Sequence, residues 1–525
     1  NSDCPFCHSK QSLLLIGSSA ANLTSTWSAS LFASSYNKDK KLLTFSDSVQ
    51  DAAHRAGYIA ARTYSTLFRT ALTKCVQKHG SLTLDKLQEK LILDCKEQFT
   101  NPVDFVATFI SQDLEWLSEW EDLQNKENPS LKDASALLKV VQKRLLWEVG
   151  AEVGYRSRLG TSVEKAGSLA ASFDYALIST FIPNLHERLQ NEIEPLRDIE
   201  ERQVQQLVIG LLQFLRQCGG LDLPELVGFN RDGTSYIKSG GTETYVFNKR
   251  IIHTPRFGSS TPKPVFICSS RGKGIFEQLF KDKGKITWPQ HWLQRSMLSD
   301  KTLENEEQKE VLNIVIESLL EKELLTEIPG DRDSKVWAIP RSRIQISPQP
   351  NLFRCVSCGD TQAIPENQSS IWDGMPCLVR HCKGTYKINP HGRSSLYKRL
   401  YEKGEINRII AREHTGLLTR PDREMLEKKY IRGKYRSDPN LLSATSTLEM
   451  GINIGDLSTV LLASVPPEPA NYLQRIGRAG RRDGNALIGT LVTGTAHDLF
   501  FFLEPKEMIK GCLLYTSDAA DEERG

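Results

Sequence analysis

The sequence contains no run of about 18 or more apolar residues, so no segment is long enough to cross a bilayer as a helix. It also lacks a charged N-terminal region followed by an apolar core, which is the pattern of a signal peptide. Neither sign of charge is in excess, because 67 lysines and arginines face 64 aspartates and glutamates, a net charge of +3. These absences predict no membrane partner. The 525 residues, 39% of them hydrophobic, predict a globular chain of about three or four domains.

Cysteine is scarce as well, and 11 cysteines in 525 residues are too few for a disulfide scaffold. Four of them nevertheless have the spacing C-x2-C-x18-C-x4-C, at Cys355, Cys358, Cys377 and Cys382. Two thiolate pairs of this kind suit tetrahedral zinc. We expect a structural Zn²⁺ in a zinc ribbon, while a metal-free cluster and a redox role stay open. Zinc ligation and reduced thiols favour an intracellular chain, and we expect it in the cytoplasm.

A second cysteine pair, Cys4 and Cys7, has only half of such a pattern. Its spacing fits part of another zinc site, whose remaining ligands would lie elsewhere, and it equally fits an incidental turn.

The order of apolar segments predicts a parallel sheet with one strand from far upstream. Residues 41–45 form a short apolar run with β character, and Ser46, Asp47 and Ser48 follow as good caps for a helix. Alternating strands and helices form parallel sheets with right-handed crossovers. We therefore expect residues 41–60 to join a C-terminal sheet, with the residues between as an insertion into one α/β domain. The other strands are expected at 405–418, 441–445, 459–464 and 487–493.

The intervening residues show two different secondary-structure patterns. From 70 to 225 the apolar positions keep a helical period, and this helical insertion includes a stretch from Asp94 to Glu127 with nine acidic and two basic residues. Such a stretch is typical of a solvated face, and recruitment of a protein partner is the other interpretation. From 226 to 350 an α+β texture predicts a helix at 306–322 and a hairpin of 324–328 with 335–339. This outline fits a winged helix and also a generic α+β insertion.

The most informative segment runs from Gln474 to Arg482 and reads QRIGRAGRR. Arg478 and Arg481 are three residues apart, and Gly477 and Gly480 let the backbone approach a ligand closely. Two guanidinium groups held in this way suit a clamp on a transferring phosphoryl group. A solvated basic helix is the alternative, although it would need neither glycine.

This segment resembles motif VI of superfamily 2 helicases, whose pattern is Q-x-x-G-R-x-G-R. The segment from Ser443 to Asp456 resembles motif V, residues 45–48 resemble motif IV, and residues 412–416 resemble the segment that usually follows motif IV. Four motifs in this order resemble the second RecA-like domain of DEAD/DEAH-box helicases.

The resemblance implies a role for each matching residue. Arg478 and Arg481 would be arginine fingers that reach the γ-phosphate of ATP held by the other RecA-like lobe, with Gln474, Gly477 and Gly480 in the same nucleotide site. Gly451 and Asn453 would lie near the ribose, although the family usually has Asp where Asn453 stands, and an amide brings no charge. Nucleic-acid contacts would come from Ser46, Asp47, Ser48, His414, Thr415 and Thr445.

Two further features bear on nucleic-acid binding. Hydroxyls and free N–H groups at the start of a helix, as at residues 46–48, form a phosphate site, while ordinary capping stays open. The stretch from His391 to Arg436 has thirteen basic and six acidic residues, a local charge of +7, with four tyrosines between them. Phosphate neutralisation and base stacking are the two needs of such binding, so this stretch predicts nucleic-acid contact, with a solvated face as the alternative.

The chain has no G-x-x-x-x-G-K-[ST] motif and no DEAD or DEAH box outside its last residues. We expect the phosphate cradle and the carboxylate for Mg²⁺ to come from a RecA-like lobe upstream of Asn1, so this chain alone should not hydrolyse ATP. Residues 512–525 resemble translated sequencing-adapter sequence, and the fold prediction leaves them out.

The leading hypothesis is the C-terminal motor half of an ATP-dependent helicase, with ATP, Mg²⁺ and Zn²⁺ as cofactors. Its partners would be nucleic acid, DNA rather than RNA, and the upstream lobe. The alternative is a non-catalytic nucleic-acid-binding scaffold on a degenerate RecA-like fold. The expected fold is α/β, a RecA-like parallel sheet with three insertions. The expected segments are a zinc-knuckle-like piece at 1–20, the lobe at 21–69 and 391–511, the helical insertion at 70–225, the α+β insertion at 226–350, the zinc ribbon at 351–390 and the adapter-like end at 512–525.

Overall fold

The computed structural model separates the chain into two compact units. The sheet unit contains the described residues of 15–70, 99–137 and 403–525, and the insert unit contains those of 71–98 and 138–402. Within the described part of the chain, no helix is long and apolar enough to span a membrane. The described residues are 19–223, 245–247, 250–252, 264–269, 276–297, 303–329, 335–389, 395–445, 448, 454–455, 457–481, 484–492 and 494–510.

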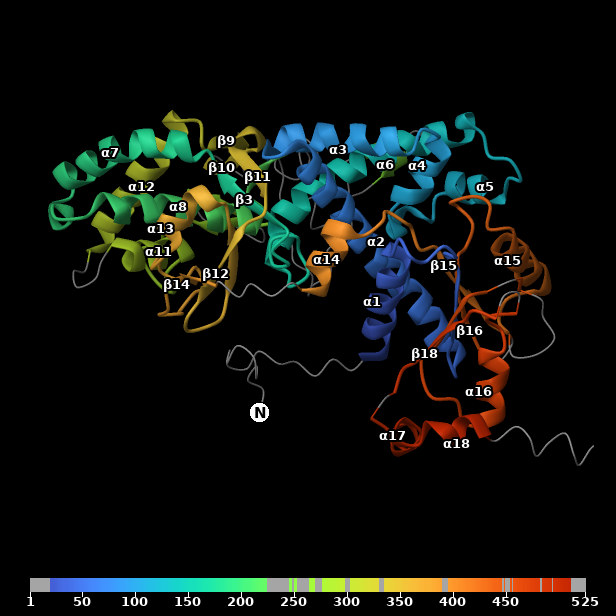
Figure 1. The fold of residues 1–525 in the computed structure, drawn as a ribbon. Helices are drawn as coiled ribbons and strands as arrows, with labels where there is room; N and C mark the ends of the chain where they lie inside the picture. Colours follow the sequence, from blue (N-terminus) through green and yellow to red (C-terminus); the bar gives the residue numbers. More distant parts are fainter. Residues whose placement is uncertain are drawn as a thin grey trace, which may run out of the picture. The chain divides into compact units, whose positions relative to one another are not determined.

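Five parallel strands form the centre of the sheet unit, in the order β15-β16-β1-β17-β18. Figure 1 labels β15, β16 and β18 of this sheet. Strand β1 lies in the middle and pairs with β16, where Leu42 is opposite Leu441, and with β17, where Leu43 is opposite Val460. The prediction that residues 41–60 join the C-terminal sheet is therefore confirmed. The strands are β1 (Leu42–Phe45), β15 (Ala411–His414), β16 (Leu441–Ala444), β17 (Thr459–Leu462) and β18 (Leu487–Thr490).

Helices cover both faces of this sheet. Successive side chains of a strand point to opposite faces, so Leu43 and Phe45 join one buried cluster and Leu42 joins the other. Tyr430 of α15 packs in the first cluster, and Ile59 of α2 packs in the second. Strands buried on both faces read as continuous apolar runs, which explains the sequence of β1. The helices of this unit are α1 (Ser19–Ala33), α2 (Val49–His79) before residue 71, α4 (Pro102–Phe109), α5 (Ser118–Asn125), α15 (Arg420–Arg432), α16 (Pro469–Ile476), α17 (Ala496–Leu503) and α18 (Pro505–Lys510).

The acidic stretch is not a uniformly solvated face. The carboxylate of Glu115 accepts hydrogen bonds from Arg408 at 3.2 Å and from Arg412 at 3.0 Å, and its side chain is only 13% exposed. Arg408 itself is buried and lies over the ring of Tyr64. The interpretation of the stretch as solvated is therefore wrong at Glu115, because its cationic partners lie almost 300 residues away in the sequence.

The insert unit contains strands where only helices were expected. Strand β3 (Leu169–Phe173) pairs antiparallel with β11 (Ile344–Pro348), so residues 70–225 are not wholly helical. All five residues of β3 are buried, and its sequence therefore shows no alternation that would reveal a strand. The helices are α3 (Leu84–Gln98), α6 (Leu131–Val153), which begins before residue 138, α7 (Tyr175–Glu192), α8 (Glu201–Cys218), α11 (Trp288–Met297), α12 (Asn305–Glu321), α13 (Ser369–Trp372) and α14 (Leu396–Lys403).

The expected helix and hairpin are present as α12, β9 and β10. The two strands pair antiparallel, and the residues that join them lie outside the described part of the chain. Strand β10 also pairs with β4 and with β7, so it belongs to a mixed sheet rather than to an isolated hairpin. The remaining strands are β2 (Leu82–Thr83), β4 (Leu221–Asp222), β5 (Tyr245–Phe247), β6 (Arg250–Ile252), β7 (Phe266–Cys268), β8 (Phe276–Gln278), β9 (Thr326–Pro329), β10 (Lys335–Pro340), β12 (Asn351–Cys355), β13 (Thr361–Ile364) and β14 (Tyr386–Ile388).

Candidate functional site

Three of the four motif segments begin at one edge of the parallel sheet. The motif VI turn lies beyond the end of α16, where the N–H of Gly480 donates to the carbonyl of Leu457 at 2.8 Å, just before β17. Parallel strands end on the same side, and ligands of open α/β sheets bind outside those carboxyl ends. Ser46 follows β1, Thr415 follows β15, Thr445 follows β16, and Ser464 lies two residues beyond β17. The fold thus brings together segments that are up to about 420 residues apart in the sequence.

The three residues after β1 have different surroundings. Ser46 is fully buried, and its N–H donates to the carbonyl of Ala444 at 2.8 Å. The hydroxyl of Ser48 accepts from the N–H of Asp51 at 3.0 Å, so Ser48 caps α2 as expected. Of the two hydroxyl groups, only that of Ser48 lies at the surface.

Asp47 connects motif IV to the helix of motif VI. Its carboxylate accepts from Arg475 Nη1 at 3.0 Å and from the hydroxyl of Ser464. Arg475 is only 4% exposed and also lies over the ring of Phe45. Sequence analysis did not single out Arg475. Its position beside Gln474 in the motif could have indicated a functional role. Nothing in the sequence, however, indicates that its side chain points inward.

The motif VI arginines lie on a tight turn that follows α16. Gly480 has φ +73°, a left-handed conformation that favours glycine, and a Cβ at Gly477 would lie 2.9 Å from the carbonyl oxygen of Leu473. Both glycines are therefore required by this turn, as the motif predicts.

The same turn gives its two arginines different exposures. Arg478 is 6% exposed, whereas Arg481 is exposed and its Nε donates to the carbonyl of Gly477 at 2.9 Å. Burial, and then the positive charge of Arg481, lower the pKa of Arg478. Gln474 is exposed on α16. Two neighbouring cations that repel each other favour an anion that would neutralise both.

The other expected nucleic-acid residues lie deeper. His414 is fully buried, and its Nε2 lies 2.8 Å from Glu427 Oε1 on α15. Thr415 is also fully buried, and the N–H of Thr445 donates to the carbonyl of His414 at 3.4 Å. These side chains lie beneath the surface at the carboxyl edge of the sheet. Their contact with nucleic acid stays a prediction. Gly451, Asn453, Cys4 and Cys7 lie outside the described residues.

In the insert unit, the four predicted zinc ligands come together. Strand β12 pairs with β13 and β14, and Cys355 ends β12, while Cys377 and Cys382 precede β14. The sulfurs of Cys355 and Cys382 are 3.6 Å apart, and those of Cys358 and Cys377 are 3.5 Å apart. All four lie within 4.8 Å of one another. Four thiolates at about 2.3 Å from one tetrahedral ion would be about 3.8 Å apart, so the cluster fits Zn²⁺.

The backbone around this cluster is shaped for four sulfurs. The N–H groups of Val379 and Gly384 each donate to a cysteine sulfur at 3.4 Å. Burial would raise the pKa of Cys355, but N–H groups of Cys358 and Ser357 hold that pKa below its ordinary value, whereas burial raises the pKa of Cys358 to about 12 and also raises the pKa of Cys377. A Cβ at Gly384 would lie 2.6 Å from the Cys355 sulfur, so only glycine leaves room for it.

A second cluster of metal-binding side chains was not expected. Cys75 and His79 of α2 and Asp94 of α3 have ligand atoms within 4.8 Å of one another. Lys78 Nζ lies 2.7 Å from Asp94 Oδ1, so an ammonium group already neutralises this carboxylate. We therefore assign no metal to this cluster.

A parallel sheet with the segments after β1, β15 and β16 at its carboxyl edge fits the C-terminal domain of a helicase. Residues 391–483 match the family described as helicase conserved C-terminal domain, and the similar proteins include superfamily 2 helicases, so this part of the chain is a helicase C-terminal domain of the superfamily 2 type.

Several proteins are similar to parts of the chain. The chain is 34% identical over 172 residues to Druantia protein DruE of Escherichia coli, and this match covers 30% of the chain and 9% of DruE. It is 37% identical over 91 residues to Lhr helicase/uracil glycosylase of Escherichia coli, and this match covers 17% of the chain and 6% of that protein. It is 29% identical over 97 residues to ATP-dependent helicase HRQ1 of Saccharomyces cerevisiae, and this match covers 18% of the chain and 9% of that protein. The crystal structure of DUF1998 helicase MrfA bound to DNA and AMPPNP matches with 28% identity, a TM-score of 0.17, and coverage of 19% of this chain and 13% of that one. The matches span less than a tenth of the length of these three curated relatives.

Proposed function

We propose that the sheet unit is the C-terminal lobe of an ATP-dependent motor that couples ATP hydrolysis to unwinding of, or movement along, nucleic acid. The observation that carries the proposal is the turn from Gly477 to Arg481. Its two glycines hold one arginine inward and one outward, directly after α16, whose Arg475 reaches Asp47 at the carboxyl edge of the sheet. Such a pair suits the charge that develops on a transferring phosphoryl group, where positioning and electrostatics do most of the catalytic work.

The roles of the individual residues follow from this placement. Arg478 and Arg481 would meet the γ-phosphate of ATP held with Mg²⁺ by a facing lobe, and Gln474 would link the nucleotide to α16. The pair of Asp47 and Arg475 supports a further role, because it joins the segment after β1 to the helix that carries the arginines. A shift of α16 on ATP binding would thus move the capped start of α2, where Ser48 would meet a backbone phosphate. We expect the nucleic acid to be DNA rather than RNA.

The insert unit would contribute structural and nucleic-acid-binding elements. We propose that Cys355, Cys358, Cys377 and Cys382 hold one Zn²⁺, which would tie the loops around β12 and β14 together. The order of α11, α12, β9 and β10 supports a winged helix, because two helices and a hairpin follow one another, although strands β5 to β8 stand between β4 and α11. The two additional strands β7 and β8 distinguish it from a minimal winged helix.

The arginine role is tested in the intact motor by nucleic-acid-stimulated ATP hydrolysis. Arginine fingers contribute about 10³–10⁵ in kcat, so Arg481→Ala should lower kcat at least a thousand-fold, with little loss of nucleic-acid binding. Lys506→Ala is the control, because Lys506 is an exposed cation of the same unit that lies outside the motif segments and outside the basic stretch from His391 to Arg436.

The outcomes separate the motor from a scaffold. An unchanged kcat in Arg481→Ala would remove the arginine finger from the proposal. Nucleic-acid binding without any ATP hydrolysis in the wild-type motor would favour the scaffold. The same measurements with DNA and RNA of equal length decide which nucleic acid stimulates hydrolysis.

A further inference from the structure

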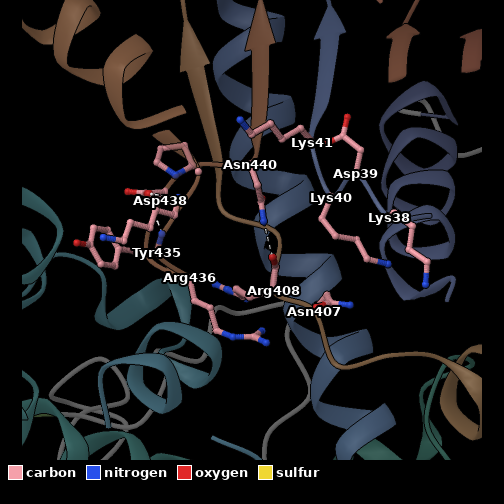
Figure 2. Close-up of a pocket in the computed structure, with 13 residues that line it drawn as sticks. Lys38, Asp39, Lys40, Lys41, Asn407, Arg408, Tyr435, Arg436, Asp438 and Asn440 are labelled. Carbon is pink, nitrogen blue, oxygen red and sulfur yellow. Dashed lines mark hydrogen bonds between the residues drawn. The ribbon is translucent and has the colours of Figure 1, made fainter. Parts of the chain in front are cut away.

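A second charged feature of the sheet unit lies at the amino edge of its sheet. A pocket of about 450 Å³ is lined by the residues directly before β1, β15 and β16. Because these strands are parallel, their amino ends lie on one side, away from Ser46, Thr415 and Thr445, which follow the carboxyl ends. Figure 2 shows the strands running away from the pocket, with Lys38 and Lys40 on one side and Tyr435 and Arg436 on the other.

The lining of this pocket is strongly basic. Its charged side chains are two aspartates and six cations, namely Lys38, Lys40, Lys41, Arg408, Lys434 and Arg436. Both aspartates already have partners. Asp39 accepts from the N–H of Ser458 at 2.9 Å, and Asp438 is bound by Arg432, which does not line the pocket. The excess of positive charge is therefore not neutralised from within.

Three of the six cations are held by the protein, and three are available. Lys40 pairs with Glu405, Lys41 donates to the carbonyl of Ile431, and Arg408 pairs with Glu115. The other three, Lys38, Lys434 and Arg436, are exposed and form no salt bridge within the described residues, although Lys434 lies over the ring of Tyr435 and Arg436 over the ring of Phe99.

The frame of the pocket is well ordered by hydrogen bonds. Asn440 joins the residues before β16 to the residues before β15. Its side-chain amide accepts from the N–H of Ile410 at 2.9 Å and donates to the carbonyl of Arg408 at 2.8 Å, and Figure 2 shows the second of these bonds. Asp438 is 3% exposed and accepts from the N–H groups of Lys434 and Tyr435, each at 3.0 Å. The turn that carries the available cations is thus fixed before any ligand binds, which lowers the entropic cost of binding.

The chemistry of the lining favours phosphate over an acidic peptide. A peptide is anchored through aromatic or aliphatic side chains in apolar pockets, and here only Pro439 and Tyr435 are not strongly polar. The ring of Tyr435 is already covered by Arg432 and Lys434, whose charges lie 4.7 and 5.2 Å from its centre. A phosphodiester backbone needs only cations and hydrogen-bond donors, which the pocket supplies.

We propose that this pocket binds backbone phosphates of the nucleic acid at the amino edge of the sheet, remote from Ser46, Thr415 and Thr445 at the carboxyl edge. The inference rests on the proposed nucleic-acid partner and adds a second contact site to it. Lys38, Lys434 and Arg436 would contact the phosphates directly, whereas Lys40, Lys41 and Arg408 would add to the local positive potential. The site would hold the nucleic acid without reading its sequence, because it contacts only the backbone.

The test measures the salt dependence of binding of a short single-stranded oligonucleotide to the full chain. Each phosphate contact contributes about 0.7 to the slope of log K against log salt. The double change Lys434→Gln with Arg436→Gln should therefore lower the slope by about 1.4 and weaken binding about twenty-fold at ~0.1 M salt. Lys38→Gln, a conservative change at an exposed residue, should lower the slope by about 0.7. The control is Lys506→Gln with Lys510→Gln, two exposed lysines of α18 outside the pocket, which should leave the slope unchanged.

Titrations with inorganic tripolyphosphate and with poly-glutamate identify other ligands. An unchanged oligonucleotide slope in both pocket variants overturns the proposal. The proposal is also overturned if the pocket variants lose binding of tripolyphosphate alone, because the occupant would then be a free polyphosphate. It is likewise overturned if they lose binding of poly-glutamate alone, because the occupant would then be an acidic protein segment. The ATPase test of Arg481 is independent of these titrations, so a failure of the motor and a failure of the pocket can be told apart.

Discussion

Replacing Gly384 by alanine would place a methyl group inside the cysteine cluster. The new Cβ would lie 2.6 Å from the sulfur of Cys355 and 2.7 Å from the Cβ of Ser357, whereas favourable contacts begin at about 3.5 Å. The sulfur must therefore move by about 1 Å. Metal–ligand distances tolerate about 0.2 Å, so a bound Zn²⁺ could not keep all four ligands. Without metal, the Cys355 side chain can rotate away, and only the contact with Ser357, which strains both states, remains.

The strain should therefore appear in the metal-bound state. We expect zinc affinity to fall about 10-fold to 100-fold, which corresponds to about 1.4–2.8 kcal/mol, while the stability of the metal-free chain changes much less. Competition with a chromophoric chelator measures the affinity, and thermal unfolding with and without chelator measures the two stabilities.

Gly374→Ala provides the matched control for this experiment. Gly374 has φ +80° and no atom within 4 Å of an added Cβ, so alanine there strains the backbone by roughly 1 kcal/mol in both states. Its zinc affinity should stay that of the wild type. Equal affinities in Gly384→Ala and Gly374→Ala would refute the reasoning, and so would a wild-type chain that binds no zinc.

Two further predictions concern ion pairs. Asp47→Asn removes the charge opposite the buried Arg475, and because the Asp47 side chain is 43% exposed we expect a modest loss of about 1–2 kcal/mol in the free energy of unfolding, measured with urea. An unchanged urea midpoint would contradict this pairing. Burial raises the pKa of Asp94, but hydrogen bonds from Lys78, His79 and Cys75 bring it below its ordinary value. The ionised Asp94 therefore contributes its full stabilisation above about pH 4, and this contribution disappears as the pH falls through the lowered pKa. The difference in melting temperature between wild type and Asp94→Asn should be constant near neutral pH and should fall to zero in acid. A difference that persists below about pH 2 would show that charge is not its cause.

What the sequence predicts well is local. The apolar run of β1 followed by Ser46 and Ser48 is a strand–helix junction that can be recognised from a few residues, and the structure contains it. The glycines of motif VI were expected to shape the backbone, and Gly480 has the left-handed conformation that requires one. The cysteine spacing likewise predicted the cluster of four sulfurs.

What the sequence does not predict depends on long-range pairing. The carboxylates of Asp47 and Glu115 look like solvated acids, but their cationic partners lie 428 and 293 residues away. The basic pocket is of the same kind, because Lys38 and Arg436 meet only once their strands lie side by side. No local pattern contains this information. Strand β3 escaped detection for the opposite reason, since complete burial removes the alternation of a strand.

The central place of β1 has a consequence for biosynthesis. Its neighbours β16 and β17 are made about 400 residues later, which at ~5–20 residues per second is roughly 20–80 s after β1 leaves the ribosome. During that time the leucines of β1 have no sheet to enter, while most of the insert unit is already complete and free to fold. A nascent chain stalled before Leu441 would therefore carry a folded insertion and an unpaired, aggregation-prone strand, which makes this lobe a client for chaperones that shield short apolar segments.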